Sequence, residues 1–556
     1  MNDTATAELQ LDIDPVTASV IQGALENIAV EMGYKLMRMS YSSIIRESED
    51  FGAGLVDASG PIPGYVRGML KTLEDRGDTI RPGDVIMHNE AYGGASHGPD
   101  VGFIVPVFDD DSLIGYSVTT AHHLDIGALS PGSCGIVDAI DAYAEGLQFK
   151  AIKVYDEGRK VDAVWHMLRD NIRASDLVVG DMEAQVAASQ IGAQRFLALV
   201  QRYGADTLER ACDQVMNHAE RLMRSAIAKV PDGTYQATTY IDGFLDSNDT
   251  TKKDLPIVAT ITVVDDAMTV DLTGTADQVA DRPINMPFVG TVDIAVWLTI
   301  RSVLLDTAVH GHIPVNDGLC RPIKIIAPEG CLANPIFPAP TIARFCPGNQ
   351  LADTVMKALG QAVPAQVSAG IGNLRVIAFS GLDGDDYWVH MEICEGSYGG
   401  REGMDGMDAV DTLYANTRNN PIEDIESHLP LRVSRYELRE DVCGAGKWRG
   451  GLGSIREFTY LKDGGGSIEG EGHKYRPWGF QGGSDGHTAG LTLRHATGES
   501  ESLPSKMPHT SANAGDSFIC VGLISIDTAL NDYGVVITDT LHLDEAATAH
   551  HRSGTA

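Results

Sequence analysis

Hydrophobic residues recur at spacings of three and four positions in two long segments of the chain, a pattern typical of amphipathic helices. The first segment, residues 15–39, follows Asp14 and begins with Pro15, a pair that favours the start of a helix. The second segment, residues 181–229, is interrupted near Gly204. Shorter helices are expected at about residues 291–306 and 351–363.

Short apolar runs separated by Gly, Pro and Asp predict strands and turns over residues 40–130. Within this part, residues 101–118 fit a strand, a turn and a return strand. The pattern is again β-rich from residue 234 to about 330 and in the C-terminal part, where the stretch 464–467 is interpreted as a flexible loop or linker. Further strands are expected at residues 257–264, 268–272, 433–438 and 455–460.

These elements predict an α+β protein of several domains, with mixed or antiparallel sheets, long helices and Gly-rich loops. The turn signal Pro231-Asp232-Gly233 marks the first expected boundary. The expected parts are an N-terminal domain (1–230), a β-rich middle domain (231–345), an α/β segment (346–430) and a Gly-rich β region (431–556).

The composition and net charge of the chain exclude some classes of binding partner. The chain has 556 residues and a formal net charge of −35, from 77 acidic and 42 basic side chains. This balance argues against binding to nucleic acid or to an anionic membrane. No apolar run is long enough for a transmembrane helix, and the first residues lack the apolar core of a secretory signal. The eight cysteines are scattered without a Cys-x-x-Cys pair, so a cytoplasmic protein with reduced thiols is expected.

The densest group of polar side chains lies in two segments on either side of the expected hairpin. His97 and Asp100 belong to a loop rich in Gly and Pro, and His122 and His123 follow about 25 residues later. A hairpin would return the His pair to the loop, where imidazoles and a carboxylate together suit a divalent metal. Neighbouring residues on a strand face opposite sides, so one His of the pair would bind the metal and the other would orient a ligand. The alternative to a metal site is that these are surface histidines in turns and that the Asp is a capping residue.

An upstream charged segment, residues 46–50, contains Glu47, Glu49 and Asp50, which could complete a metal site or form a solvated edge. Other candidates are weaker. The segment 444–453 is rich in glycine, but Trp448 follows Lys447, so it is no Walker motif and turn-forming glycines are favoured. Cys346 precedes a helix, which would lower a thiol pKa, although a buried structural thiol is the favoured interpretation.

The order of these motifs resembles the hydantoinase B/oxoprolinase family. This family includes the B-type subunits of ATP-dependent hydantoinases, lactamases and 5-oxoprolinases, and the related large subunits of acetone and acetophenone carboxylases. The resemblance covers nearly the whole chain and is most specific in the two His-containing motifs. The similar segments are residues 41–57, 89–100, 121–127, 416–421, 429–438, 444–453, 477–479 and 533–537.

The resemblance implies that Asp50, His97 and His122 bind a divalent metal (Zn, Mn or Fe), with Asp100 as a further ligand or close neighbour. It also implies a hetero-oligomer with a hydantoinase A-type subunit that binds ATP and Mg²⁺, which agrees with the lack of a Walker motif here. In such a reaction Asp125 or Glu47 is a candidate general base.

The function expected from this resemblance is that of a metal-containing subunit that opens a cyclic amide (a hydantoin, 5-oxoproline or a lactam) after the partner has phosphorylated it. One alternative is the large subunit of an ATP-dependent ketone carboxylase of the acetone or acetophenone type, which the segment 41–48 favours slightly. The second alternative is a non-catalytic scaffold for the ATPase subunit. Dependence on bicarbonate separates carboxylation from hydrolysis.

Overall fold

The first layer of the molecule is a six-stranded antiparallel sheet with the strand order β1-β4-β3-β2-β5-β6. It is seen in a computed structural model that describes residues 13–58, 65–313, 315–415, 417–439 and 447–523. Its strands are β1 (Phe51–Asp57), β2 (Val85–His88), β3 (Asp100–Asp109), β4 (Ser112–His122), β5 (Ile152–Asp156) and β6 (Arg159–Lys160).

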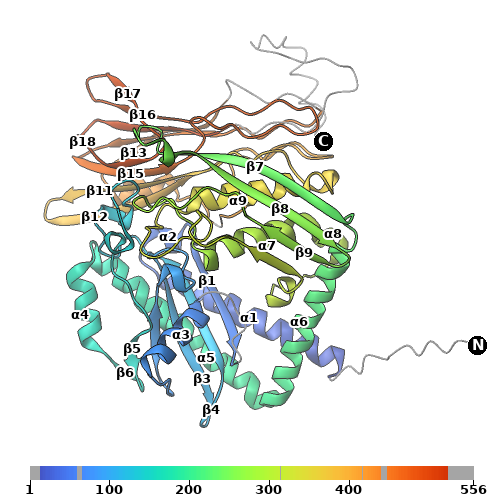
Figure 1. Cartoon of the computed structure of the whole chain (residues 1–556). Helices are drawn as coiled ribbons and strands as arrows, with labels where there is room; N and C mark the ends of the chain where they lie inside the picture. Colours follow the sequence, from blue (N-terminus) through green and yellow to red (C-terminus); the bar gives the residue numbers. More distant parts are fainter. Residues whose placement is uncertain (1–12, 59–64, 314, 416, 440–446, 524–556) are drawn as a thin grey trace, which may run out of the picture.

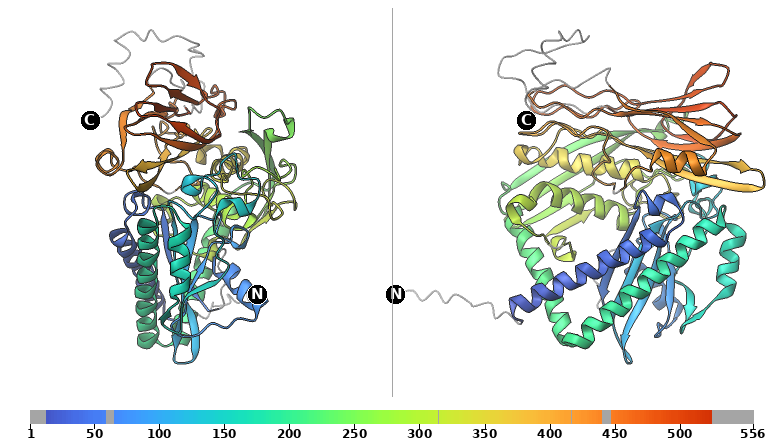
Figure 2. Two further views of the ribbon diagram at one scale, coloured as in Figure 1. Left: turned by 90° about the vertical axis from the view of Figure 1, so that its left-hand side faces the viewer. Right: turned by 180° about the vertical axis from the view of Figure 1, so that it is seen from behind.

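Long helices cover one face of this sheet and a short helix covers the other. Helices α1 (Pro15–Met39) and α5 (Ser175–Tyr203) lie side by side on one face of the sheet, in front of it in the right-hand view of Figure 2. Helix α3 (Tyr65–Arg76) packs on the opposite face. Because side chains alternate along a strand, Phe103 of β3 joins the core under α5 whereas Ile104 joins the core under α3.

The expected helices are confirmed, and the break near residue 204 is confirmed as well. Gly204 has a φ of +83° and separates α5 from α6 (Ala205–Ile227), a backbone conformation that glycine adopts without strain. Helices α3 and α4 (Asp162–Asn171) were not expected from the hydrophobic pattern. The remaining short helices are α2 (Ser43–Arg46), α8 (Thr307–His310) and α10 (Ile422–His428).

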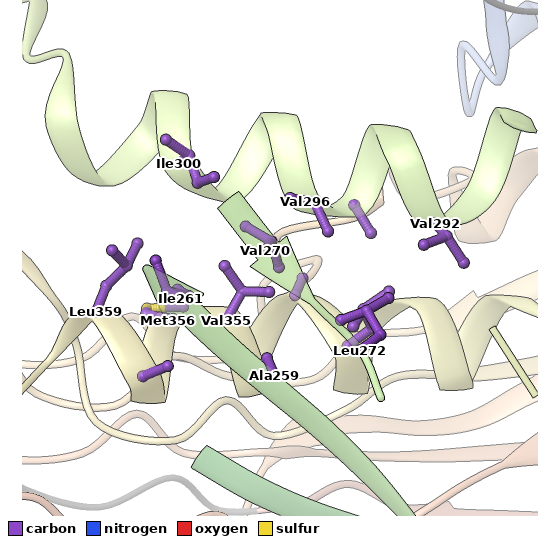
Figure 3. Close-up of a cluster of buried hydrophobic side chains, with 14 of the residues drawn as sticks. Ala259, Ile261, Val270, Leu272, Val292, Val296, Ile300, Val355, Met356 and Leu359 are labelled. Atoms are coloured by element: carbon purple, nitrogen blue, oxygen red, sulfur yellow. The ribbon is translucent and has the colours of Figure 1, made fainter. Parts of the chain in front are cut away.

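The middle layer is a four-stranded sheet packed against two helices. Strands β7 (Gly233–Gly243), β8 (Lys253–Val264), β9 (Ala267–Asp271) and β10 (Ile323–Ile326) form it, and only the β9–β10 pair is parallel. Helices α7 (Asp293–Leu304) and α9 (Phe345–Leu359) bury their apolar faces on this sheet. Figure 3 shows Val296 and Ile300 of α7 directed toward Val270 and Val355.

The C-terminal layer consists of two antiparallel sheets that enclose an aromatic core, drawn in orange and red at the top of Figure 1. One sheet has the order β12-β11-β15-β18 and the other the order β13-β14-β19-β16-β17. Phe379, Phe458 and Phe518 lie between them. The strands are β11 (Arg375–Asp383), β12 (Asp386–Cys394), β13 (Leu431–Leu438), β14 (Ser454–Tyr460), β15 (Gly464–Gly470), β16 (Gly490–Arg494), β17 (Ser500–Ser502), β18 (Met507–Ala512) and β19 (Ser517–Val521).

The interpretation of residues 464–467 as a flexible loop is wrong, because these residues begin the interior strand β15 between β11 and β18. The glycines are required by close contacts. A Cβ on Gly464 would lie 2.5 Å from the Ser380 carbonyl oxygen, and one on Gly465 would lie 2.7 Å from that of Thr510. A side chain at either position would therefore force the sheet apart.

The expected α+β class with mixed and antiparallel sheets is confirmed. The sheet containing β11 and β12 also contains β15 and β18, so this sheet crosses the expected boundary between residues 430 and 431. The similar segment 533–537 and two of the five glycines of 444–453, Gly444 and Gly446, lie outside the described residues. Within the described ranges, no helix has both the length and the apolar character needed to cross a membrane.

Candidate metal centre

Three candidate residues lie at one end of the first sheet because its strands are antiparallel. Strand β3 begins at Asp100 and β4 ends at His122, and these two residues are direct partners in the ladder. Strand β1 begins next to Asp50, with Phe51 opposite Ala121. The expected hairpin over residues 101–118 is thus confirmed, and it returns His122 to the loop that precedes β3.

The loop before β3 adds His97 to this end of the sheet. The loop turns sharply at Gly94 and Ser96, which have φ values of +105° and +66°. His97 is buried, and its backbone N–H donates to the Ala95 carbonyl at 2.7 Å. The middle layer supports the loop from outside: a Cβ on Gly290 would lie 2.7 Å from the Gly94 carbonyl oxygen. Glycine at 290 therefore permits the two layers to approach each other at the site.

Three candidate metal-binding atoms form a nearly equilateral triangle. His97 Nε2 lies 3.2 Å from His122 Nδ1, and Asp100 Oδ1 lies 3.1 Å from each of these nitrogens. Metal–ligand bonds of about 2.1 Å around one tetrahedral or octahedral ion separate neighbouring ligand atoms by about 3.0–3.4 Å. The triangle therefore has the size that one divalent cation requires. In the described part of the chain, no other group of His, Cys, Asp and Glu side chains has such an arrangement.

Neighbouring groups orient two of these three side chains. The carbonyl oxygen of Ile342 lies 3.4 Å from His97 Nδ1 and can accept its proton in a hydrogen bond, which leaves Nε2 free to bind a metal. Arg344 Nη2 donates to Asp100 Oδ2 at 3.1 Å, and Arg344 Nε donates to Ser96 Oγ at 2.7 Å. Asp100 can thus offer one oxygen to the triangle while Arg344 holds the other.

The protonation states at the triangle suit a cation. Burial lowers the pKa of His97 to about 4, so this imidazole is neutral at neutral pH. Burial opposes the charge of Asp100, but His97, His122 and Arg344 hold the pKa of this carboxyl well below its usual range. The ligand set near neutral pH therefore contains a neutral imidazole and a carboxylate, which are the forms that bind metals.

The triangle lies in a cavity of about 280 Å³ between the first sheet, the middle layer and β11–β12. Asp50, Asp100 and Glu469 are the carboxylates of its wall, and Arg344 is the one Lys or Arg among the described residues that line it. A divalent cation would balance the two carboxylates that Arg344 leaves uncompensated. The apolar part of the wall is formed mainly by Phe51, Ile136, Ile294, Ile342, Phe345, Val376, Met391 and Ile393.

Asp50 lies on the wall of this cavity, but its carboxylate is not part of the triangle. Its backbone carbonyl accepts a hydrogen bond from the His122 N–H at 3.1 Å. Burial raises the pKa of Asp50 to about 6, against the opposing effect of His122. A cation in the cavity would favour the ionised form of this group.

The other expected site residues lie elsewhere. His123 Nε2 is 2.8 Å from Gln185 Oε1, on the opposite side of the strand from His122. Asp125 accepts hydrogen bonds from the backbone of Gly127 and Gly132 and from Arg173. Neither His123 nor Asp125 lines the cavity.

Glu47 is also absent from the cavity wall and pairs with Arg46 at 2.8 Å. Sequence reasoning missed Arg344 and Ile342, although it examined their neighbour Cys346. The Cys346 side chain is fully buried, and burial raises the pKa of its thiol, so the interpretation as a buried thiol is confirmed. The only signal for Arg344 was a lone basic residue between Ala343 and Phe345.

Comparisons with known proteins give matches over nearly the whole chain. A family model described as hydantoinase B/oxoprolinase matches residues 14–522. A Pseudomonas sp. (strain NS671) protein, named as the putative B-type subunit of a D-/L-hydantoinase, is 59% identical over 572 residues, covering 96% of this chain and 97% of that protein.

Two solved structures share the fold. The crystal structure of the ATP-dependent caprolactamase from Pseudomonas jessenii matches with a TM-score of 0.83 and 27% identity, over 98% of this chain and 100% of the matched chain. A nucleotide-free acetone carboxylase structure matches with a TM-score of 0.84 over 97% of this chain and 82% of the matched chain. Its identity of 16% makes this second match evidence for the fold alone.

Proposed function

The chain belongs to the hydantoinase B/oxoprolinase family, and from this premise we propose that it is the metal-containing catalytic subunit of an ATP-dependent enzyme. Its reaction is the opening of a cyclic amide: a hydantoin, 5-oxoproline or a lactam. Relatives named as a hydantoinase subunit and an ATP-dependent caprolactamase support this substrate class.

The observation that carries the proposal is the triangle of His97 Nε2, His122 Nδ1 and Asp100 Oδ1 in a largely apolar cavity. We assign these three side chains as ligands of Zn²⁺, Mn²⁺ or Fe²⁺, since all three ions accept imidazole and carboxylate ligands. Asp50 is proposed as the fourth ligand, from the cavity wall. The bound ion would lower the pKa of a water molecule toward neutrality.

The charge and polarity of the residues around the triangle suit the binding of a phosphorylated amide. Together with His97 and His122, Arg344 favours the ionised form of Asp100, and it is a cation that can face a phosphate group. The apolar part of the wall lowers the local dielectric constant, which strengthens electrostatic interactions inside the cavity. Glu47 and Asp125 lie outside the cavity, so we assign neither of them the role of general base.

We further propose that ATP and Mg²⁺ bind to a hydantoinase A-type partner in a hetero-oligomer. The relative at 59% identity is named as one subunit of a hydantoinase, which implies a partner chain. The sequence contains no Gly-x-x-x-x-Gly-Lys-[Ser/Thr] motif, in agreement with nucleotide binding elsewhere.

The test is reconstitution of this chain with an A-type subunit and measurement of ATP hydrolysis together with ring opening, across hydantoins, 5-oxoproline and lactams. We expect turnover without bicarbonate and its loss in His97→Ala. Strict dependence on bicarbonate with a ketone substrate would identify a carboxylase instead. Unchanged turnover in His97→Ala would identify a scaffold.

A further inference from the structure

Glu145 is a buried carboxylate that binds a backbone segment from a distant part of the chain. Its side chain is at the end of a short 3-10 helix, Ala142–Glu145, and the residue is 5% exposed. Glu145 Oε1 accepts hydrogen bonds from the backbone N–H groups of Thr341 and Ile342, each at 2.6 Å. Glu145 Oε2 lies 3.3 Å from Thr341 Oγ1. One carboxylate thus fixes two successive peptide groups.

The segment held in this way contacts two of the three triangle residues. The carbonyl of Ile342, whose N–H is bound by Glu145, faces His97 Nδ1 at 3.4 Å. Two residues later, Arg344 forms the ion pair with Asp100. A displacement of this segment would therefore change the orientation of both His97 and Asp100.

Glu145 acts from outside the cavity. It is not among the described residues that line the cavity, so any influence on the triangle passes through residues 341–344. Other bonds hold the flanks of this segment: Tyr92 Oη donates to the Ala339 carbonyl at 2.6 Å, and the Ala343 N–H donates to the Pro283 carbonyl at 2.7 Å. Among the described residues, Glu145 is the side chain that accepts from the N–H groups of Thr341 and Ile342.

The chemistry of this contact distinguishes two substitutions. Replacement of Glu145 by Ala leaves two buried N–H groups without an acceptor, and the segment must shift to satisfy them. Replacement by Gln keeps a carbonyl oxygen in place of Oε1, the atom that accepts from both N–H groups. Groups that orient metal ligands typically change metal affinity by about 10–100-fold when they are removed.

We propose that Glu145 is a positioning residue for the triangle: by fixing the peptide groups of Thr341 and Ile342, it sets the orientation of His97 and Asp100. This inference rests on the proposed metal site and extends it to a residue that does not line the cavity. It predicts that metal affinity depends on the acceptor oxygen at position 145.

The experiment measures Zn²⁺ affinity of metal-free protein by competition with a chromophoric chelator. The proteins are wild type, Glu145→Ala, Glu145→Gln and Ile300→Ala. Ile300 is fully buried in the middle layer and does not line the cavity, so Ile300→Ala is the control for a general loss of stability. We expect about tenfold or greater loss of affinity in Glu145→Ala, and affinity within about threefold of wild type in Glu145→Gln and Ile300→Ala. Thermal unfolding of each variant shows that the protein measured is folded.

The outcomes separate this inference from the proposed function. If wild type binds no Zn²⁺, Mn²⁺ or Fe²⁺, the proposed function fails. If wild type binds the ion and folded Glu145→Ala binds it equally well, the positioning role is overturned and the metal site stands. An equal loss of affinity in Glu145→Gln and Glu145→Ala also overturns the inference, because Gln retains the acceptor oxygen. If Glu145→Ala does not fold, wild-type affinity in Glu145→Gln supports the inference and a tenfold loss there contradicts it.

Discussion

Asp100 and Arg344 form an ion pair of 3.1 Å, although 244 residues separate them in the chain. The same carboxylate directs its other oxygen to His97 and His122. Asp100 therefore connects the sheet of the N-terminal part to the segment that precedes α9.

Removal of either imidazole should remove the metal. We expect purified wild type to contain about one divalent ion per chain, and His97→Ala and His122→Ala to lose it, because each variant keeps only one imidazole beside the proposed carboxylate ligands Asp100 and Asp50. Elemental analysis after dialysis against a chelator provides the measurement. His428→Ala is the control, since this imidazole is exposed and does not line the cavity. Equal metal content in all four proteins would contradict the assignment.

Arg344→Gln should weaken metal binding while the protein stays folded. The substitution removes the cation that donates to Asp100 Oδ2. This cation, beside His97 and His122, also holds the pKa of the Asp100 carboxyl low. We expect roughly 10–100-fold weaker Zn²⁺ binding, the range for residues that orient ligands. Arg435→Gln, in an ion pair on the surface, is the matched control and should bind Zn²⁺ as wild type does.

Asp50→Asn tests the fourth ligand. An amide oxygen is a weaker metal ligand than a carboxylate, so we expect at least about tenfold weaker Zn²⁺ binding. Asp110→Asn, at the opposite end of the β3–β4 hairpin, serves as the comparison. Unaltered affinity in Asp50→Asn, accompanied by lost turnover, would assign Asp50 to the reaction and remove it from the ligand set.

Stability of the metal-free protein should depend on pH through Glu145. Burial raises the pKa of Glu145 from 4.5 to about 7, so the folded protein keeps this proton to a higher pH than the unfolded chain does. The contribution of this proton to the free energy of unfolding is complete below about pH 4.5 and is lost as the pH rises to about 7.

Glu145→Gln cannot lose this proton. Its free energy of unfolding relative to wild type should therefore rise by up to about 3 kcal/mol between about pH 4.5 and pH 8. Urea unfolding at both pH values measures the difference. A difference that does not vary with pH would show that Glu145 titrates normally.

Glu392→Gln should strongly destabilise the C-terminal layer. Glu392 Oε2 lies 2.6 Å from Arg456 Nη2, and both side chains are buried. Burial opposes the charge of Glu392, but Arg456 and His390 hold its pKa below the ordinary value. Loss of the carboxylate removes the nearer of the two carboxylates that pair with the buried Arg456 guanidinium and leaves Glu395 Oε1 at 3.4 Å, which costs up to about 3–5 kcal/mol.

Denaturant unfolding measures this effect. The control is Glu437→Gln, which removes an exposed ion pair with Arg435 and should change stability little. Equal stability of the two variants would show that Arg456 finds another acceptor.

The sequence predicted the part of the site that depends on local pattern. A strand, a turn and a return strand over residues 101–118 are enough to bring Asp100 opposite His122, because hairpin pairing follows from alternation and turn position. Arg344 and Ile342 could not be found in this way, since their contacts with Asp100 and His97 depend on how separate layers pack. Periodicity carries no information about such contacts.

The glycines of β15 show a second limit of pattern reading. A run such as Gly464-Gly465-Gly466 is typical of flexible linkers, and no hydrophobic alternation distinguishes it from one. Its role in the fold comes from neighbouring strands that leave no room for a Cβ. The same absence of side chains that suggests flexibility is here a condition for close packing.

The span between Asp100 and Arg344 has a consequence for protein synthesis. A nascent chain exposes His97, Asp100 and His122 long before residue 344 has left the ribosome. Until then the carboxylate lacks its guanidinium and His97 lacks the Ile342 carbonyl, so under the proposed assignment the early chain would hold an ion less tightly than the finished one. If the proposed site is the metal site, tight metal acquisition would be a late step in biogenesis, completed when the segment before α9 packs against the hairpin.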